Sequence, residues 1–274
     1  MAFDFYESST EEGRPIYLYR FTLNSLVWRF TSADADIEAA GALWAAVPIS
    51  DDGVKLTGES VTDALTITTS SKIEPAQIYM RFPPSSLMQV AILRTHDEDF
   101  DDIKTVYVGE VTQCNVPTPG TAVFTCETLA STMKREGLRM AWQRDCPHAL
   151  YDPNTCRVNK VAFGVLATAT LAENGHVKAP ELNAYPWTYF PGGFIEWLDP
   201  DRGIERRTIE AQGPDGLIRL FGTGDGIEVG QQFTAYPGCA HNTDACKGFG
   251  NLLNYGGIPD LAGKSPFDGD PVFI

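Results

Sequence analysis

Four of the six cysteines fall into two pairs, and cysteine thiolates are strong ligands for soft metals. Cys146 and Cys156 lie in the stretch QRDCPHALYDPNTCRV, and Cys239 and Cys246 lie in PGCAHNTDACKGF. Both stretches are rich in turn-forming residues, which argues against long helices or strands. If the chain between the pairs forms one compact module, its two ends lie close together, and the four thiols are expected to meet.

Three kinds of site compete with simple unlinked, buried thiols for these four residues. A disulfide within each pair fits the small loops but does not fit a reducing compartment. A Cys₄ zinc site fits the ligand chemistry, although nine and six intervening residues exceed the usual spacing of zinc knuckles. A [4Fe–4S] cluster also takes four thiolates, tolerates wide spacing and benefits from glycine-rich backbone that donates N–H groups to sulfur. The residues alone leave these alternatives open.

Two histidines and the other two cysteines are further candidate ligands, but their positions in the sequence indicate other roles. His148 and His241 each follow a cysteine by two residues and could replace it in a mixed site. Loop histidines more often orient a neighbouring ligand or are simply solvated, so we expect that role here. Cys114 and Cys126 lie in strand-like runs, and we interpret them as small buried hydrophobic residues that could approach each other across a hairpin.

An acidic stretch, HDEDFDD, raises the question of calcium binding, because Asp97, Asp99 and Asp101 alternate along it. In a calcium loop of the EF-hand type, the sixth position is glycine and the twelfth is glutamate. These positions hold Asp102 and Val108, so the EF-hand interpretation fails. We expect a solvated acidic loop.

The chain carries none of the short motifs that mark common enzyme classes. It has no G-x-S-x-G, no H-E-x-x-H, no phosphate-binding loop and no dinucleotide-binding glycine motif. A cysteine hydrolase built from Cys239 and His241 would need side chains that face each other, which residues two apart in a loop rarely do. We therefore predict that the protein is not an enzyme.

Composition and charge narrow the class of protein. The 274 residues include 43% hydrophobic residues, enough to bury a sizeable core, and carry a formal net charge of −15. Such an acidic chain repels nucleic acid and anionic membrane, although an acidic surface can still line a passage for DNA. The N-terminus lacks the pattern of a signal peptide, and no apolar run reaches the length of a membrane span. We expect folding in a reducing cytoplasm.

The elements that must position the cysteines are mainly β-strands, because apolar, β-branched and aromatic residues recur in short alternating runs. The first half predicts an antiparallel barrel or sandwich. Its expected strands are 16–21, 25–30, 64–70, 76–82, 88–94, 105–114 and 121–128, with a loop leading into a further strand at 44–49. A helix is expected at 129–138. A second β-rich region follows, with strands within 163–173, 192–199, 205–212, 217–222 and 228–238.

The cysteine segments also carry a family resemblance. The chain resembles the baseplate hub proteins of long-tailed phages and gene transfer agents, and more distantly the tail tip protein L of lambda-like phages. The residues that match in the later segment are Cys239, Cys246, Asn251, Asn254, Gly256 and Gly257. Those that match in the earlier segment are Gln143, Arg144, Cys146, Leu150, Tyr151 and Cys156.

The resemblance implies a mainly β fold with three parts. These are an N-terminal antiparallel, barrel-like hub domain, an inserted second β module, and metal-cluster loops that join them. The expected divisions are residues 1–140, 141–157, 158–236 and 237–274. A [4Fe–4S] cluster, with zinc as the alternative, would be held by Cys146, Cys156, Cys239 and Cys246 and would fasten the second module closed.

The implied function is that of a structural virion protein, assembled in the host cytoplasm and located in the tail baseplate. It would link the end of the tail tube to tip or fibre components as a homotrimer. Its partners would be the distal tail or tube protein and the central tip or fibre protein. DNA would pass through the ring without specific binding, and no membrane span is expected. The alternative is a cytoplasmic metal-dependent enzyme or redox protein that uses the same four cysteines.

Overall fold

The chain folds into two compact units built mainly from β-strands, which confirms the expectation of a mainly β fold. The structure is a computed structural model that describes residues 6–8, 14–54, 64–97, 99–128, 142–200, 202–224 and 226–261. One unit contains Met1–Arg135 and Leu198–Glu205, and the other contains Glu136–Trp197 and Arg206–Ile274. The finer division into four segments stays a prediction.

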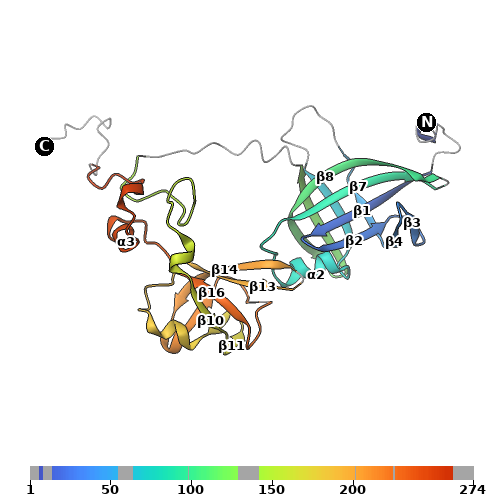
Figure 1. The fold of residues 1–274 in the computed structure, drawn as a ribbon. Coiled ribbons are helices and arrows are strands. Elements are labelled where there is room, and N and C mark those ends of the chain that lie inside the picture. Colours follow the sequence, from blue (N-terminus) through green and yellow to red (C-terminus); the bar gives the residue numbers. More distant parts are fainter. Residues whose placement is uncertain are drawn as a thin grey trace. The chain divides into compact units, whose positions relative to one another are not determined.

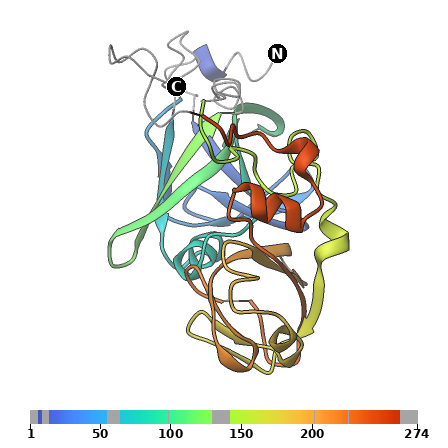
Figure 2. The same ribbon diagram turned by 90° about the vertical axis from the view of Figure 1, so that its left-hand side faces the viewer.

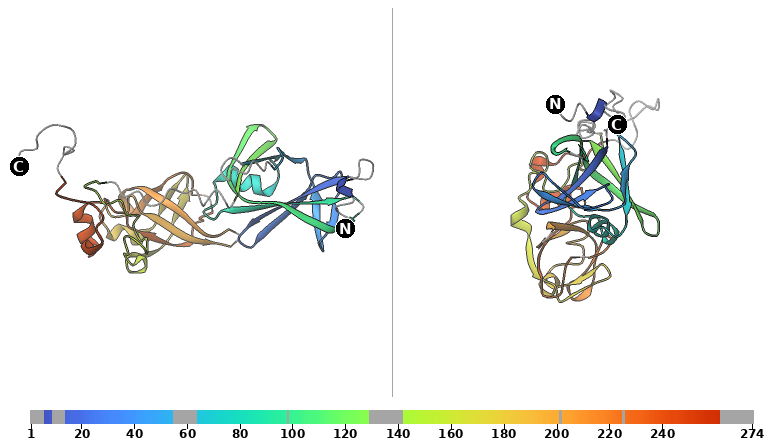
Figure 3. Two further views of the ribbon diagram at one scale, coloured as in Figure 1. Left: turned by 90° about the horizontal axis from the view of Figure 1, so that it is seen from above. Right: turned by 90° about the vertical axis from the view of Figure 1, so that its right-hand side faces the viewer.

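The first unit contains a nine-stranded sheet that curls on itself (Figures 1 and 3). Its strands lie in the order β3-β4-β2-β1-β7-β8-β9-β6-β5. Neighbouring strands are antiparallel, apart from the parallel pair β2 and β4. The bounds are β1 (Pro15–Leu23), β2 (Leu26–Thr31), β3 (Ile37–Ala39), β4 (Ala42–Ala46), β5 (Ile49–Asp51), β6 (Leu65–Ser70), β7 (Met88–His96), β8 (Asp99–Thr118) and β9 (Thr121–Thr128).

The core of this unit fills the concave side of the curled sheet. Alternating residues of the strands point inward, as in β9, where every second side chain is buried. The rings of Phe21 and Phe124 lie 5.2 Å apart between their centroids. Helix α2 (Glu74–Arg81) contributes Ala76 and Ile78 to the same core. Burial of this apolar surface is the main force that holds the sheet in its curled form.

Three expectations for the first unit were wrong. Residues 76–82 form helix α2 instead of a strand, because Glu74 and Pro75 occupy its first turn, where an acidic side chain and a fixed proline φ both favour a helix start. The expected loop before residue 44 contains the hairpin of β3 and β4. The expected acidic loop is the β7–β8 hairpin, in which His96 pairs with Asp99. The helix expected at 129–138 lies outside the described residues.

The second unit is built on a seven-stranded antiparallel sheet in the order β10-β16-β13-β14-β15-β12-β11. Its strands are β10 (Val165–Thr168), β11 (Leu171–Glu173), β12 (His176–Lys178), β13 (Phe194–Asp199), β14 (Gly203–Gln212), β15 (Leu217–Leu220) and β16 (Gln232–Tyr236). Its helices are η2 (Lys160–Phe163), η3 (Pro180–Ala184), η4 (Pro214–Gly216), α3 (Thr243–Gly248) and η5 (Leu252–Asn254). Strand β12 was not expected from the sequence, whereas the five expected strand regions are confirmed.

Close backbone packing fixes where the chain leaves this sheet and enters the second cysteine segment. A side chain at Gly238 would collide with the carbonyl oxygen of Pro191, and one at Gly193 would collide with that of Tyr236. Only glycine permits backbones to approach so closely. Cys239 follows directly, so its position is set by the packed end of β16.

Candidate metal centre

The four paired cysteines line one cavity in the second unit. The cavity has a volume of about 20 Å³. Cys156 and Cys246 are buried, Cys146 and Cys239 are half-buried, and each is a free thiol. The structure thus brings together residues 93 positions apart, from Cys146 to Cys239, as the sequence predicts. Figures 1 and 2 show the first segment, in yellow-green, beside α3, in red.

The first segment, residues 142–159, has no regular secondary structure and is shaped by Asp152. The side-chain oxygen Oδ1 of Asp152 accepts hydrogen bonds from the backbone N–H groups of Asn154, at 2.6 Å, and Thr155, at 3.1 Å. Its carbonyl oxygen accepts the N–H of Arg157 at 2.7 Å. This turn reverses the chain between the two cysteines and places Cys156 next to the cavity.

An aromatic cluster attaches the first segment to the sheet. The ring of Tyr151 lies 6.0 Å from Phe194, 6.1 Å from Tyr236 and 6.3 Å from Phe249, measured between centroids. Its hydroxyl donates a hydrogen bond of 3.0 Å to the carbonyl oxygen of Pro237. Tyr151 therefore contacts β13, β16 and the residue after α3 at once. These contacts hold both cysteine segments against the same end of the sheet.

The second segment, residues 237–261, positions its cysteines with a short helix. The side chain of Asn242 caps α3 by accepting the N–H of Ala245 at 2.8 Å, and Cys246 lies within this helix. The run Asn-Thr-Asp at 242–244 is a typical helix start, so this helix was detectable in the sequence although we did not predict it. Asn242 and Phe249 also line the cavity.

Gly256 and Gly257 pack against the first segment without room for side chains. A Cβ atom at Gly256 would collide with the imidazole of His148, and one at Gly257 would collide with the carbonyl oxygen of Arg144. The N–H of Gly256 donates to the sulfur of Cys146 at 3.4 Å. The two glycines of the family pattern thus have a steric reason: backbone must reach the Cys146 loop directly.

Each of the four sulfur atoms has a polar partner. Three receive N–H groups: Cys239 from the backbone of His241 at 3.3 Å, Cys146 from Gly256 as described, and Cys156 from Nδ2 of Asn251 at 3.6 Å. The thiol of Cys246 donates to the carbonyl oxygen of Asn251 at 3.2 Å. N–H groups that point at sulfur are the donors that a cluster-bound thiolate accepts.

The thiols also oppose one another's ionisation. Burial raises the pKa of Cys239, Cys156 and Cys146 nearby raise it further, and the N–H of His241 acts against the rise. Burial raises the pKa of Cys246 too, with added contributions from Cys146, Cys156 and Cys239. Four thiolates in one cavity repel each other. A cationic metal group bound between them would neutralise this repulsion and favour the thiolate form.

The donor set fits a thiolate-bound metal group. Four cysteines are the ligands of both zinc centres and [4Fe–4S] clusters, and the N–H groups at the sulfurs suit a cluster. Cys146, Cys156, Cys239 and Cys246 would hold the group, which would link the two segments covalently when bound. Among the described residues, no three or more His, Cys, Asp or Glu side chains gather closely enough to hold a single ion.

The two loop histidines occupy supporting positions. Nδ1 of His148 lies 3.2 Å from the carbonyl oxygen of Asn254, and Nδ1 of His241 lies 2.9 Å from that of Cys146. A carbonyl oxygen only accepts hydrogen bonds, so Nδ1 is the protonated nitrogen in both rings. Both rings line the cavity and connect its two segments.

Cys114 and Cys126 belong to the first unit and take no part in this cavity. They lie on the paired strands β8 and β9, with Cys126 in the core and Cys114 packed against it. Burial raises the pKa of Cys114 to about 11 and that of Cys126 to about 12. Both thiols therefore stay neutral at physiological pH and act as small apolar side chains.

Comparison with known proteins relates this site to phage proteins. Residues 188–265 match the family described as "Phage conserved hypothetical protein BR0599". The matched part includes Cys239, Cys246, Asn251 and the glycine pair. An uncharacterized protein of Xylella fastidiosa (strain 9a5c) is 24% identical over 219 residues, which are 69% of this chain and 45% of that protein. The aligned part of the chain thus spans less than half of that relative.

The fold matches a chain from the virion of a native gene transfer agent particle. The TM-score is 0.74 with 16% sequence identity, and the match covers 99% of this chain and 96% of that chain. The two chains therefore share one fold across both units. No helix in the described part of the chain is long and apolar enough to cross a membrane.

Proposed function

We propose that the chain is a structural protein of a phage or gene transfer agent virion and serves as the baseplate hub. The observation that carries the proposal is the structural match to a gene transfer agent virion chain over 99% of this chain. The phage family match over residues 188–265 supports it independently, because it rests on sequence. The role is structural and not enzymatic.

In this role the chain forms a homotrimeric ring at the end of the tail tube. The N-terminal sheet continues the tube toward the distal tail protein, and the cysteine-bearing part holds the central tip or fibre protein. The formal charge of −15 per chain supports a conduit that repels the DNA backbone and lets it slide. Ring closure requires complementary faces on each protomer, and strand edges of the sheets can supply them.

The thiol cavity holds a [4Fe–4S] cluster in this proposal, with zinc as the alternative group. Support comes from the four cysteines that line one cavity and from the N–H groups at three of the sulfurs. A bound cluster joins the two segments that enter and leave the second sheet. Its binding free energy then adds to the stability of this unit.

Exposed apolar side chains on the cysteine segments support a contact with a further virion component. Leu253 is fully exposed on η5, and Leu252, Ile258 and Trp142 are also exposed. Turn η5 is fixed at both ends, because Asn251 contacts two cysteines and Asn254 contacts His148. Exposed apolar side chains on a turn that is held at both ends can contact a protein partner.

The proposal is tested first on anaerobically purified protein. We expect a brown protein with broad absorbance near roughly 400 nm and about four irons per chain, as thiolate-bound [4Fe–4S] clusters give. Stoichiometric zinc without iron would show that the alternative metal is correct. For the virion role, a reconstruction of purified particles should show three copies around the tail axis. Absence of the chain from assembled tails would refute the hub role.

A further inference from the structure

Two residues of the second segment each contact two cysteines, one from the first segment and one from the second. His241 contacts Cys146 and Cys239, and Asn251 contacts Cys156 and Cys246. The two sets share no cysteine. Together they account for all four thiols of the cavity.

Three hydrogen bonds join His241 to the cysteines. Its carbonyl oxygen accepts the N–H of Cys146 at 2.7 Å, and its ring Nδ1 donates to the carbonyl oxygen of Cys146 at 2.9 Å. Its own N–H donates to the sulfur of Cys239 at 3.3 Å. The backbone of His241 has φ +57°, a left-handed conformation that a residue with a side chain adopts at a cost. The bonds to the two cysteines explain why this conformation persists.

Asn251 makes a second, separate connection. Its Nδ2 donates to the carbonyl oxygen of Cys156 at 2.5 Å and lies 3.6 Å from the sulfur of the same residue. Its carbonyl oxygen accepts the thiol of Cys246 at 3.2 Å, and its N–H donates to the carbonyl oxygen of Cys246 at 3.0 Å. Its Oδ1 accepts Nδ2 of Asn254 at 2.7 Å, which fixes the amide orientation.

We propose that His241 and Asn251 are the positioning residues of the thiol cavity, and that each fixes one pair of cysteines, one from each segment, before any metal group binds. Only the identity of the bound group rests on the proposed function; the positioning role is a property of the metal-free chain. The physical reason is entropic. Ordering two irregular segments costs conformational entropy. Hydrogen bonds formed during folding offset part of this cost, so less of it remains when a metal group binds.

The decisive experiment measures the reactivity of each cysteine in the full-length chain after metal removal under reducing conditions. The protein is treated with limiting N-ethylmaleimide, and modification of each cysteine is followed by mass spectrometry, with Cys114 as the internal reference. The Asn251→Ala variant removes the side-chain bonds to Cys156 and keeps the backbone bonds to Cys246. We therefore expect Cys156 to react faster by on the order of tenfold, while Cys146, Cys239 and Cys246 keep their rates. His241→Ala removes the ring bond to Cys146 and keeps the backbone N–H at Cys239, so Cys146 should react faster selectively.

Two further variants separate positioning from general loss of structure. Asn251→Leu keeps the approximate size without adding a charge and loses the N–H donor, so Cys156 should again react selectively. Leu253→Ala changes a fully exposed side chain on the adjacent turn and should leave all four rates unchanged. Equal acceleration of all four cysteines in each of the Asn251 and His241 variants would overturn the proposal. Uniformly fast reaction in the metal-free wild type would overturn it as well.

A measurement on the loaded protein distinguishes the positioning proposal from the proposed cluster. Loss of an N–H group at sulfur lowers the reduction potential of an iron–sulfur cluster. The Asn251→Leu variant should therefore show a lower midpoint potential than the wild type, with iron retained. A wild-type protein without iron would refute the proposed cluster while leaving the thiol pattern intact. An unchanged potential together with unchanged thiol rates would refute the role of Asn251 alone.

Discussion

At the scale of single residues, close packing of the two cysteine segments requires a residue without a side chain at position 256. Gly256 has no space for a methyl group, because His148 occupies it, and its N–H reaches the sulfur of Cys146. A side chain here must push apart the two cysteine segments. The glycine in the family pattern is thus explained by packing between segments, not by a positive φ angle.

We predict that Gly256→Ala destabilises the second unit and lowers its metal content. Overpacking of this kind costs about 1–3 kcal/mol of unfolding free energy. Gly248→Ala is the matched control, because a Cβ atom there meets no neighbour within 4 Å. Urea titration and metal analysis of both variants test the prediction. Equal stability of the two variants would show that the contact with His148 is not tight in solution.

A second residue-scale prediction contrasts the two kinds of cysteine. Cys146→Ser and Cys239→Ser remove cavity thiols, so we expect loss of the metal group and a less stable second unit. Cys114→Ser and Cys126→Ser change strand residues of the first unit and should cost only about 1–3 kcal/mol, with metal retained. Metal analysis of the four variants decides the matter. The same metal content in all four would mean that the cavity thiols are not the ligands.

At the scale of elements, most strands could be predicted from the sequence, whereas the tertiary contacts between elements could not. Alternation in β6 and β9 was visible because one face of each strand is buried. Helix α2 was missed, because its aromatic and β-branched content resembles a strand and its burial depends on the curled sheet around it. Local propensity cannot report such tertiary contacts.

The candidate site shows the same limit. The paired cysteines were found from residue type, spacing and resemblance, because those are local features. The hydrogen bonds of His241 and Asn251 connect residues 95 positions apart, so no local pattern could reveal them. Their roles became visible only when both segments were placed beside the same end of the sheet.

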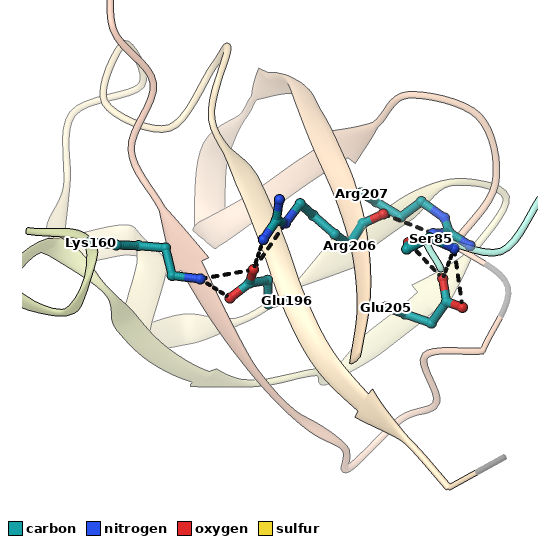
Figure 4. A network of polar contacts seen from close by, with 6 residues as sticks. All are labelled: Ser85, Lys160, Glu196, Glu205, Arg206 and Arg207. Carbon is teal, nitrogen blue, oxygen red and sulfur yellow. Dashed lines mark hydrogen bonds and ion pairs between the residues drawn. The ribbon is translucent and has the colours of Figure 1, made fainter. Parts of the chain in front are cut away.

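A charged network joins η2, which directly follows the first cysteine segment, to β13 and β14 of the second unit (Figure 4). Nζ of Lys160, in η2, lies 2.7 Å from Oε2 of Glu196 in β13, and Nε of Arg206 in β14 lies 2.9 Å from Oε1 of the same carboxylate. Arg206 also stacks over the ring of Phe194, at 4.7 Å from its centroid. Burial opposes ionisation of Glu196, but the bonds from Lys160 and Arg206 outweigh it and hold the pKa below its usual value.

We predict that Glu196→Gln lowers the unfolding free energy at neutral pH by about 1–2 kcal/mol. Because the pKa is lower in the folded state, the stabilisation by Glu196 is present above the pKa of the unfolded chain. It is lost as the pH falls through the folded value. The difference between wild type and variant should therefore shrink under acid conditions. Denaturant titrations at several pH values measure this, and a difference that grows toward low pH would contradict the assignment.

The matched control for this network is the exposed pair of Arg219 and Glu210. Their atoms NH2 and Oε1 lie 3.0 Å apart, and both side chains are about half exposed. Exposed ion pairs contribute little to stability because water and salt screen them. Glu210→Gln should thus change the unfolding free energy by less than about 1 kcal/mol at any pH. An effect as large as that of Glu196→Gln would show that burial is not the cause.

At the scale of the whole molecule, the four cavity thiols are confined to one of the two units. The first unit is a curled sheet without a cavity cysteine, whereas all four cavity thiols belong to the second unit. The N-terminal sheet should therefore fold whether or not metal is present, and metal should control only the part that carries η5 and its exposed leucines. In the proposed hub, this arrangement lets the ring form independently of the surface that receives the next component.

The final prediction concerns that surface. Leu253 is fully exposed, so Leu253→Ser should leave stability within about 0.5 kcal/mol of the wild type and leave metal content unchanged. An exposed leucine on a fixed turn is nevertheless suited to fill an apolar pocket of a partner, and its replacement by a polar side chain weakens such contacts. We expect fewer complete tail tips, counted by electron microscopy of particles that carry the variant. Val161→Ser is the matched control, because Val161 is 80% exposed on η2, and it should assemble normally. Normal tips with Leu253→Ser, or an equal loss with Val161→Ser, would show that η5 does not contact the next component.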